Sequence, residues 1–150
     1  MTPACELCSL LAGFDADAGQ GGALLWRDAR LAVVLVDEPA YPGFCRVVWH
    51  AHVKEMTDLP AAERSHIMDV VWQVELAQRD VMRAEKINVA SFGNMTPHVH
   101  WHVIPRYRDD AHFPNPTWAA AQRQTPAEAL AARRALLPQL RAAIVQRLAA

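Results

Sequence analysis

The sequence has no hydrophobic run long enough to cross a membrane and no marked excess of charge of either sign. Its apolar stretches fall short of the ~18 residues expected of a membrane-spanning helix. Fifteen basic residues stand against 16 acidic ones, which gives a formal net charge of −1. Nucleic acid or an anionic membrane surface would therefore find no general electrostatic attraction. The N-terminus also lacks the cationic lead of a signal peptide. We expect a cytoplasmic protein with no nucleic-acid or membrane partner.

Cysteine is scarce, with three in the chain. An odd and small number does not fit a disulfide framework. Cys5 and Cys8 form a C-x-x-C pair, which in a reducing compartment is typical of half a zinc site or of a redox couple. A redox couple is expected at the end of a strand, whereas this pair precedes the first predicted strand, so zinc is favoured if two further ligands exist. Cys45 lies in an apolar stretch and is expected to be a small buried side chain.

The length of 150 residues and the 52% hydrophobic content predict one domain over residues 1–150. The predicted strands are 24–27, 31–37, 44–49, 87–92 and 98–104. Apolar residues at three- and four-residue spacing predict one long amphipathic helix from about residue 60 to about residue 85. The order of strands, one helix and further strands favours an α+β fold with a mainly antiparallel sheet of about five strands.

The two ends of the chain carry weaker signals. Residues 9–12 are expected to form a short helix or turn, and the glycine-rich residues 13–22 a loop. Near the C-terminus, Thr125-Pro126-Ala127-Glu128 forms a capping box with proline at the first helical position. It predicts a C-terminal helical tail, which Pro138 should kink or split.

Three histidines alternate with apolar residues between positions 98 and 104. In a β-strand successive side chains point to opposite faces, so His98, His100 and His102 would share one face at intervals of about 6.5 Å. Each imidazole needs a hydrogen bond, a proton or a metal ion to be buried without a large cost. Three of them on one face therefore mark the candidate functional site.

The segment His98-Val-His100-Trp-His102-Val-Ile resembles the signature of the histidine triad family. The resemblance continues in Asp37 ahead of a Pro/Gly loop, in His52 at the end of a strand, and in Pro105-Arg106 after the triad. It covers about residues 5–108, which leaves residues 109–150 as a C-terminal extension. The resemblance implies a single domain of the histidine triad fold and a homodimer.

The resemblance also implies a nucleotide hydrolase or nucleotidyl transferase. Such an enzyme cleaves at the α-phosphate of a nucleoside phosphate derivative, for example a dinucleoside polyphosphate or a nucleoside phosphoramidate. The middle histidine is the family's nucleophile, which by this resemblance is His100. A neutral imidazole attacks phosphorus readily and would form a covalent nucleotidyl-histidine intermediate. His102 would hydrogen-bond the phosphate or the leaving group and stabilise the charge that develops.

Relatives that carry the cysteine pair, similar to galactose-1-phosphate uridylyltransferases, use their first histidine in a zinc site. By this resemblance the zinc ligands are Cys5, Cys8, His52 and His98. Two thiolates and two imidazoles form a closed tetrahedral site, which is structural because no position is left for water. His50 competes with His52 for the fourth place, since both can lie on one strand face; we favour His52.

The nucleotide-binding residues that the resemblance implies are Asp37, Asn88, Asn94 and Thr96. The carboxylate would hold ribose hydroxyls, Asn88 would lie near the phosphates, and the other two stand in a turn where relatives place a Gln-Ser pair. Backbone amides of that turn can bind an anion. Arg106 would either add positive charge to the site or lie in solvent at a strand end.

Two other functions stay open from the sequence. In the first, the three histidines are ligands of a catalytic metal, which would make the protein a metallohydrolase. A non-catalytic nucleotide-binding protein on the same fold is the second alternative. Phe44 stands where many relatives have a histidine near the active site, which leaves the hydrogen-bond partner of the triad open.

Overall fold

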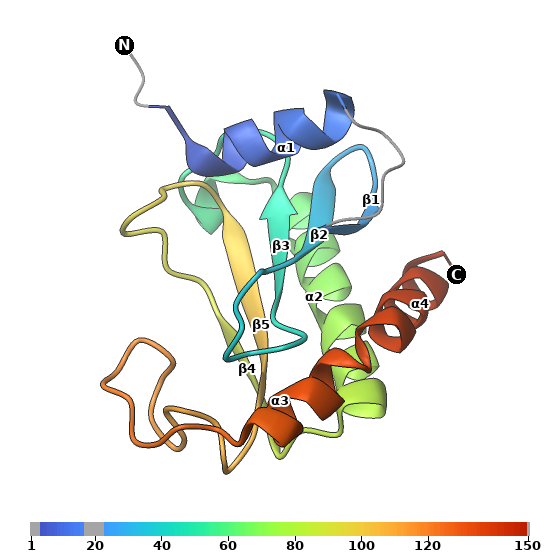
Figure 1. The fold of residues 1–150 in the computed structure, drawn as a ribbon. Helices are drawn as coiled ribbons and strands as arrows, with labels where there is room; N and C mark the ends of the chain where they lie inside the picture. The colour runs from blue at the N-terminus through green and yellow to red at the C-terminus, as the bar shows by residue number, and fades with distance from the viewer. Residues whose placement is uncertain (1–3, 17–22, 150) are drawn as a thin grey trace.

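The computed structural model describes residues 4–16 and 23–149 (Figure 1). Its helices are α1 (Glu6–Ala16), the 3-10 helix η1 (Met56–Asp58), α2 (Ala61–Met82), α3 (Ala127–Arg134) and α4 (Leu137–Leu148). Its strands are β1 (Leu24–Arg27), β2 (Leu31–Leu35), β3 (Cys45–Trp49), β4 (Lys86–Ala90) and β5 (His100–Arg106). The strands form one antiparallel sheet in the order β1-β2-β3-β5-β4. The predicted α+β fold, with one long helix and a helical tail, is confirmed.

Helices cover the two faces of the sheet (Figure 1). On one face, α2 and α4 pack against alternate strand residues such as Val33, Val47 and Val103. On the other face, α1 packs Leu7 and Leu11 against the remaining alternate residues of β2 and β3. Side chains along a strand alternate between the two faces. Because Val103 of β5 points into the core beneath α2, His100 and His102 of the same strand point to the α1 face.

Helix α2 confirms the long helix predicted from apolar spacing. Its buried residues include Ile67, Val71 and Val74, all fully inaccessible to solvent. It ends at Met82, earlier than predicted, because Arg83 adopts the left-handed conformation with φ of 50°. Although α2 is the longest helix, no helix within residues 4–16 and 23–149 combines the length and apolar character that crossing a membrane requires.

The first histidine of the triad lies outside the strand, which corrects the predicted strand 98–104. Strand β5 begins only at His100, and His98 stands in a bend ahead of it. The Val99 amide donates to the Val53 carbonyl at 2.7 Å. This bond holds the segment against the loop that follows β3. Val99 packs in the same core cluster as Val103, and His98 faces the cysteines at the start of α1, so the side-chain alternation extends beyond the strand itself.

The N-terminal helix is longer than the sequence predicted. It runs from Glu6 to Ala16, where only residues 9–12 were expected to be helical and a loop was expected from residue 13. Leu7 and Leu11, one helical turn apart, are 3% and 4% exposed against the sheet. Tertiary burial thus stabilises a segment of weak local propensity. Residues 17–22 of the predicted loop lie outside the described residues.

The C-terminal tail divides into two helices, as Pro138 predicted. Residues 135–136 separate α3 from α4, and Pro138 stands in the first turn of α4. The predicted capping box does not form: the Thr125 hydroxyl donates to the Asp109 carbonyl at 2.9 Å, and α3 has no side-chain cap. The Thr125 hydroxyl is therefore used for a contact with the loop after β5, and this contact connects the tail to the sheet.

Candidate functional site

A cavity of about 620 Å³ opens on the α1 face of the sheet. It is bounded by the start of α1, by β3 and β5, by residues 92–96 and by residues 117–118. Residues that line it include Arg46, Asn94, Thr96, His100 and His102. Its volume lies within the range of about 300–1,000 Å³ that is typical of small-molecule sites. Two of the three triad histidines therefore face a cavity large enough for a small organic ligand.

The ring of His100 is oriented by a backbone carbonyl. Its Nδ1 lies 2.6 Å from the carbonyl oxygen of His98. Because a carbonyl can only accept, Nδ1 must carry the proton, which leaves the lone pair on Nε2. Burial lowers the pKa of His100, the hydrogen bond to His98 raises it, and the charge of Arg46 lowers it, with a net lowering. The imidazole is thus neutral and has an unprotonated nitrogen, which are the properties of a nucleophile at pH 7.

His102 lies next to His100, with the two ring centroids 5.1 Å apart. Its ring contacts two aromatic side chains, Phe44 at 5.4 Å and Phe92 at 5.6 Å between centroids. Burial, and then the charges of Arg46 and His100, lower the pKa of His102 to about 4. At neutral pH His102 is therefore uncharged, and it can act through a hydrogen bond.

Arg46 is a cavity residue that the sequence reasoning missed. It pairs directly with His102 across β3 and β5. Its guanidinium carbon lies 5.6 Å from the centroid of the Phe44 ring. Among the lining residues that the structure describes, Arg46 alone carries a permanent positive charge. The sequence did carry a signal for this residue. Arg46 is a single charged residue in an apolar strand, and its side chain points to the opposite face from those of its neighbours Cys45 and Val47.

Residues 92–96 form a turn at the rim of the cavity. Gly93 has a φ of +91°, a conformation that favours glycine. Asn94 and Thr96 both line the cavity. The carbonyl of Thr96 accepts a hydrogen bond from the His98 amide at 2.8 Å, so this turn is fixed to the segment that enters β5.

Aromatic side chains stand at the mouth of the cavity. Phe92 and Trp118 meet edge to face with centroids 4.6 Å apart, and they are 50% and 65% exposed. Trp118 was not predicted as a site residue, because it lies in a proline-broken segment with no periodicity. Exposed aromatic rings beside a cavity provide a surface on which a planar ligand group can stack.

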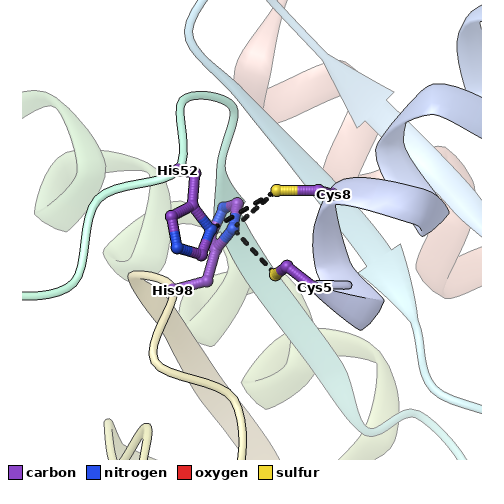
Figure 2. Close-up of side chains that lie close together, drawn as sticks. All are labelled: Cys5, Cys8, His52 and His98. Atoms are coloured by element: carbon purple, nitrogen blue, oxygen red, sulfur yellow. Dashed lines mark hydrogen bonds between the residues drawn. The ribbon is translucent and has the colours of Figure 1, made fainter. Parts of the chain in front are cut away.

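A second group of side chains lies between the start of α1 and the segment that enters β5, as Figure 2 shows. Cys5 and Cys8 come from the start of α1, His52 from the loop after β3, and His98 from the bend before β5. One donor atom from each of the four lies within 4.8 Å of the others. In the described part of the chain this cluster contains His52 and not the alternative His50. The sequence-predicted zinc ligands are thus brought together from three separate segments.

The geometry of this cluster fits a tetrahedral zinc ion. The Nδ1 atom of His98 lies 3.5 Å from both sulfur atoms, and Nδ1 of His52 lies 3.4 Å from Cys8 Sγ. Zn–S bonds of about 2.3 Å and Zn–N bonds of about 2.0–2.1 Å at tetrahedral angles separate nitrogen from sulfur by about 3.5 Å. These three nitrogen–sulfur distances therefore match edges of a zinc tetrahedron, and all four donor atoms lie within 4.8 Å of one another.

The tautomer of His98 also suits a metal ligand. Its Nε2 lies 2.6 Å from the Trp49 carbonyl oxygen and must donate to it, so the lone pair is on Nδ1, which faces both cysteines. Desolvation, and then the hydrogen bond and charge of Cys5, raise the pKa of the Cys8 thiol. A bound cation would offset this by stabilising both thiolates.

His98 connects the cluster to the cavity. Its ring belongs to the Cys5/Cys8/His52 group, whereas its backbone carbonyl accepts the Nδ1 proton of His100. The residue that holds α1 to the sheet thus also fixes the tautomer of the neighbouring histidine.

The structure does not bring every predicted residue to the cavity. Asp37 lines a separate hollow, together with Arg134 and Leu137. Asn88 accepts a hydrogen bond from Arg106 at 2.7 Å and is not among the lining residues. Arg106 is neither solvated nor part of the cavity: it is 2% exposed and paired with Asp110 at 2.7 Å. The two partners are only four residues apart, but the burial of the pair depends on contacts of Arg106 to Asn88 and to the Asn115 carbonyl, which the local sequence does not reveal.

Residues 21–109 match the protein family described as the HIT domain, which is more than half of the chain. One curated relative is named AP-4-A phosphorylase and comes from Mycobacterium tuberculosis strain H37Rv. It is 30% identical over 98 residues, and the match covers 61% of this chain and 50% of the relative. The chain therefore spans about half the length of this relative.

Solved structures show the same fold. A histidine triad protein from Marinobacter aquaeolei VT8 has a TM-score of 0.67 at 23% identity, with 93% of this chain and 98% of that chain covered. A zinc-bound histidine triad family protein from Mycobacterium smegmatis has a TM-score of 0.57 at 23% identity, with 93% and 97% covered. At these identities the likeness establishes the shared fold.

Proposed function

The chain belongs to the HIT domain family, and on that premise we propose that it is a nucleotide hydrolase or nucleotidyl transferase. The bond cleaved is at the α-phosphate of a nucleoside phosphate derivative, such as a dinucleoside polyphosphate or a nucleoside phosphoramidate. The observation that supports this most directly is the His100 ring, whose Nδ1 donates to the His98 carbonyl and whose unprotonated Nε2 belongs to a cavity-lining residue. The relative named AP-4-A phosphorylase also supports nucleotide chemistry.

The proposed reaction has two steps. His100 Nε2 attacks the α-phosphorus, a P–N bond forms, and the leaving group departs with the electron pair of the bond that breaks. In the second step water attacks the phosphorus of the nucleotidyl-histidine, and the imidazole leaves with its electron pair while the water proton passes to solvent. Imidazole is a good nucleophile in the first step and a good leaving group in the second, so two easier substitutions replace one difficult substitution by water. In a transferase another acceptor takes the place of water.

The neighbouring residues would bind and orient the phosphates. His102 is neutral at pH 7 and can hydrogen-bond the α-phosphate or the leaving group. Asn94 and Thr96 line the same cavity, and we propose that they bind phosphate oxygens. Nucleotide binding by Asp37 and Asn88 stays a prediction, because neither residue lines this cavity.

We propose that Cys5, Cys8, His52 and His98 hold a structural zinc ion. When bound, zinc would stabilise the two thiolates and hold α1 against the sheet. The histidine triad family protein from Mycobacterium smegmatis is zinc-bound, which supports this assignment. A site with two reduced thiolates also suits a reducing compartment, which supports a cytoplasmic location.

A homodimer is a further part of this proposal. Strand β4 lies at one edge of the sheet, and an edge strand offers backbone groups to a second chain. Trp72 and Leu76, one turn apart on α2, are 44% and 37% exposed. Sedimentation velocity tests this part: twice the chain mass is expected, and a monomer at high micromolar concentration would contradict it.

The nucleotidyl-histidine intermediate can be tested by single-turnover labelling. The zinc-loaded protein is mixed with diadenosine tetraphosphate or adenosine 5′-phosphoramidate that carries a radiolabelled α-phosphate, and is quenched in base. We expect a protein adduct that is stable in base and labile in acid, as a P–N bond to histidine is. The His100→Ala variant should form none.

His66→Ala is the matched control, because His66 lies on α2 and pairs with Asp28 away from the cavity. It should label like the wild type. No adduct and no turnover with either substrate would contradict the proposed chemistry and leave nucleotide binding alone. Loss of tightly bound zinc in His100→Ala, measured by metal analysis, would instead favour a metallohydrolase that uses the triad as ligands.

A further inference from the structure

Arg46 is a half-buried cation, and no hydrogen bond from its guanidinium to another residue is found in the described part of the chain. Within the described residues its Nε atom is buried and has no hydrogen-bond partner. The acidic group that acts on it is Glu6, which is exposed at the start of α1. Taking a guanidinium partly out of water without a partner costs free energy. An anion bound in the cavity would offset this loss of solvation free energy.

The surroundings of Arg46 fix where its charge acts. The side chain lies over the Phe44 ring and stands directly across from His102. Phe44 limits the directions in which the guanidinium can move. The other basic candidate, Arg106, is held by Asp110, Asn88 and the Asn115 carbonyl outside the cavity. Positive charge in the described cavity therefore depends on Arg46.

We propose that Arg46 binds the phosphate of an anionic leaving group and so makes the site selective for nucleotides in which phosphate leaves from the α-phosphorus. The inference rests on the proposed function. When the P–O bond to such a group breaks, the leaving oxygen takes the electron pair, and a guanidinium stabilises that charge without giving up a proton. An amine leaving group needs a proton instead, which arginine does not supply. Dinucleoside polyphosphates should therefore be better substrates than phosphoramidates.

The test compares two substrates in matched variants. kcat/KM is measured for diadenosine tetraphosphate and for adenosine 5′-phosphoramidate in the wild type and in Arg46→Gln. We expect a loss of about 100-fold for the tetraphosphate, the size typical of removing one transition-state donor, and little change for the phosphoramidate. Arg46→Lys, which keeps the charge, should recover part of the activity toward the tetraphosphate.

Arg30→Gln is the control for the change in net charge. Arg30 is exposed and pairs with Glu63 away from the cavity, so both substrates should react as with the wild type. Equal losses for the two substrates in Arg46→Gln would overturn the proposal, because they would mean that Arg46 serves the shared α-phosphate or the fold. Unchanged activity toward the tetraphosphate would overturn it as well.

A binding measurement separates this inference from the proposed reaction. Calorimetric titration of ATP and AMP is carried out in the His100→Ala background, where no turnover consumes ligand. Adding Arg46→Gln should weaken ATP binding at least about tenfold, as the loss of a charged hydrogen bond does, and leave AMP binding nearly unchanged. Equal effects on both ligands would overturn the role of Arg46 even if the adduct forms. If the wild type forms no adduct but Arg46→Gln still weakens ATP binding as expected, the proposed reaction is rejected and the role of Arg46 in phosphate binding stands.

Discussion

At the scale of single residues, backbone carbonyls decide what each histidine can do. Trp49 fixes the proton of His98 on Nε2, and His98 fixes that of His100 on Nδ1. One ring therefore presents Nδ1 to two cysteines, while the next retains a free Nε2. Two chemically identical side chains, two positions apart, acquire different roles from the hydrogen bond that each one donates.

Asp110 is the residue on which the largest single stability effect is expected. It is 1% exposed, and it accepts hydrogen bonds from Arg106 and from the amides of Tyr107, His112 and Phe113. Burial alone would raise its pKa, but these donors lower the pKa to about 2. Asp110→Asn leaves Arg106 buried without a counter-charge and should cost about 3–5 kcal/mol of unfolding free energy at pH 7. Urea denaturation measures this loss.

Asp109→Asn is the control, because Asp109 pairs with Arg133 near the surface and should lose less than about 1 kcal/mol. The pH dependence has a defined sign. The Asp110 carboxylate has a lower pKa in the folded than in the unfolded chain, where it is about 3.9. The stability that the Asp110 carboxylate contributes is complete above about pH 5 and is lost progressively as the pH falls toward 2. A deficit of Asp110→Asn that stayed constant over that range would contradict the assignment.

At the scale of elements, α1 is held to the sheet by two kinds of contact. Leu7 and Leu11 pack on β2 and β3, and Cys5 and Cys8 meet His52 and His98 at its first turn. An isolated helix of this length is marginal in water. The cluster therefore connects an element of low intrinsic stability to the segment that orients His100.

Removing the metal should loosen α1 selectively. With zinc chelated, or in Cys8→Ser, amides of α1 should exchange with solvent faster by at least about tenfold, whereas those of α2 should keep their protection. Hydrogen exchange read by mass spectrometry measures both helices in one experiment. Ser9→Ala, an exposed neighbour on the same helix, should exchange like the wild type. Equal protection of α1 with and without chelator would argue against a structural metal.

At the scale of the whole molecule, the C-terminal tail shares the core of the sheet. Leu140 and Ile144 of α4 are 1% and 0% exposed, and they join the cluster formed by α2 and the strands. Residues 117–118 of the preceding segment line the cavity. The region after residue 108 thus contributes both to the core and to the mouth of the site.

Ile144→Ala tests whether α4 is part of one cooperative unit. The substitution should lower the unfolding free energy by about 2–5 kcal/mol in a single transition, because it opens a cavity between α4 and α2. The neighbouring Val145 is 40% exposed, and Val145→Ala should cost about 0.5 kcal/mol or less. Thermal unfolding followed by circular dichroism compares the two. Two separate unfolding transitions, or equal losses of stability in Ile144→Ala and Val145→Ala, would indicate a tail that folds independently of the sheet.

The sequence by itself determined the elements and much of the site chemistry. Period-two alternation located the strands and set His100 and His102 on one face, and apolar spacing located α2, because side chains two, three or four positions apart are neighbours within a single element. Family resemblance then indicated four zinc ligands, whose side chains the structure brings together.

Tertiary structure decided which of the candidate groups meet. The bend at His98, the pairing of Arg46 with His102, the burial of Arg106 against Asp110 and the position of Trp118 at the cavity all depend on it. The contacts of Arg46 and Trp118 join distant segments through strand register and loop docking, which no local pattern encodes. Arg106 and Asp110 are only four residues apart, but their burial depends on the rest of the fold. The sequence thus indicated the candidate groups, and the folded chain assigned most of their partners, because contacts between distant residues exist only after the sheet has formed.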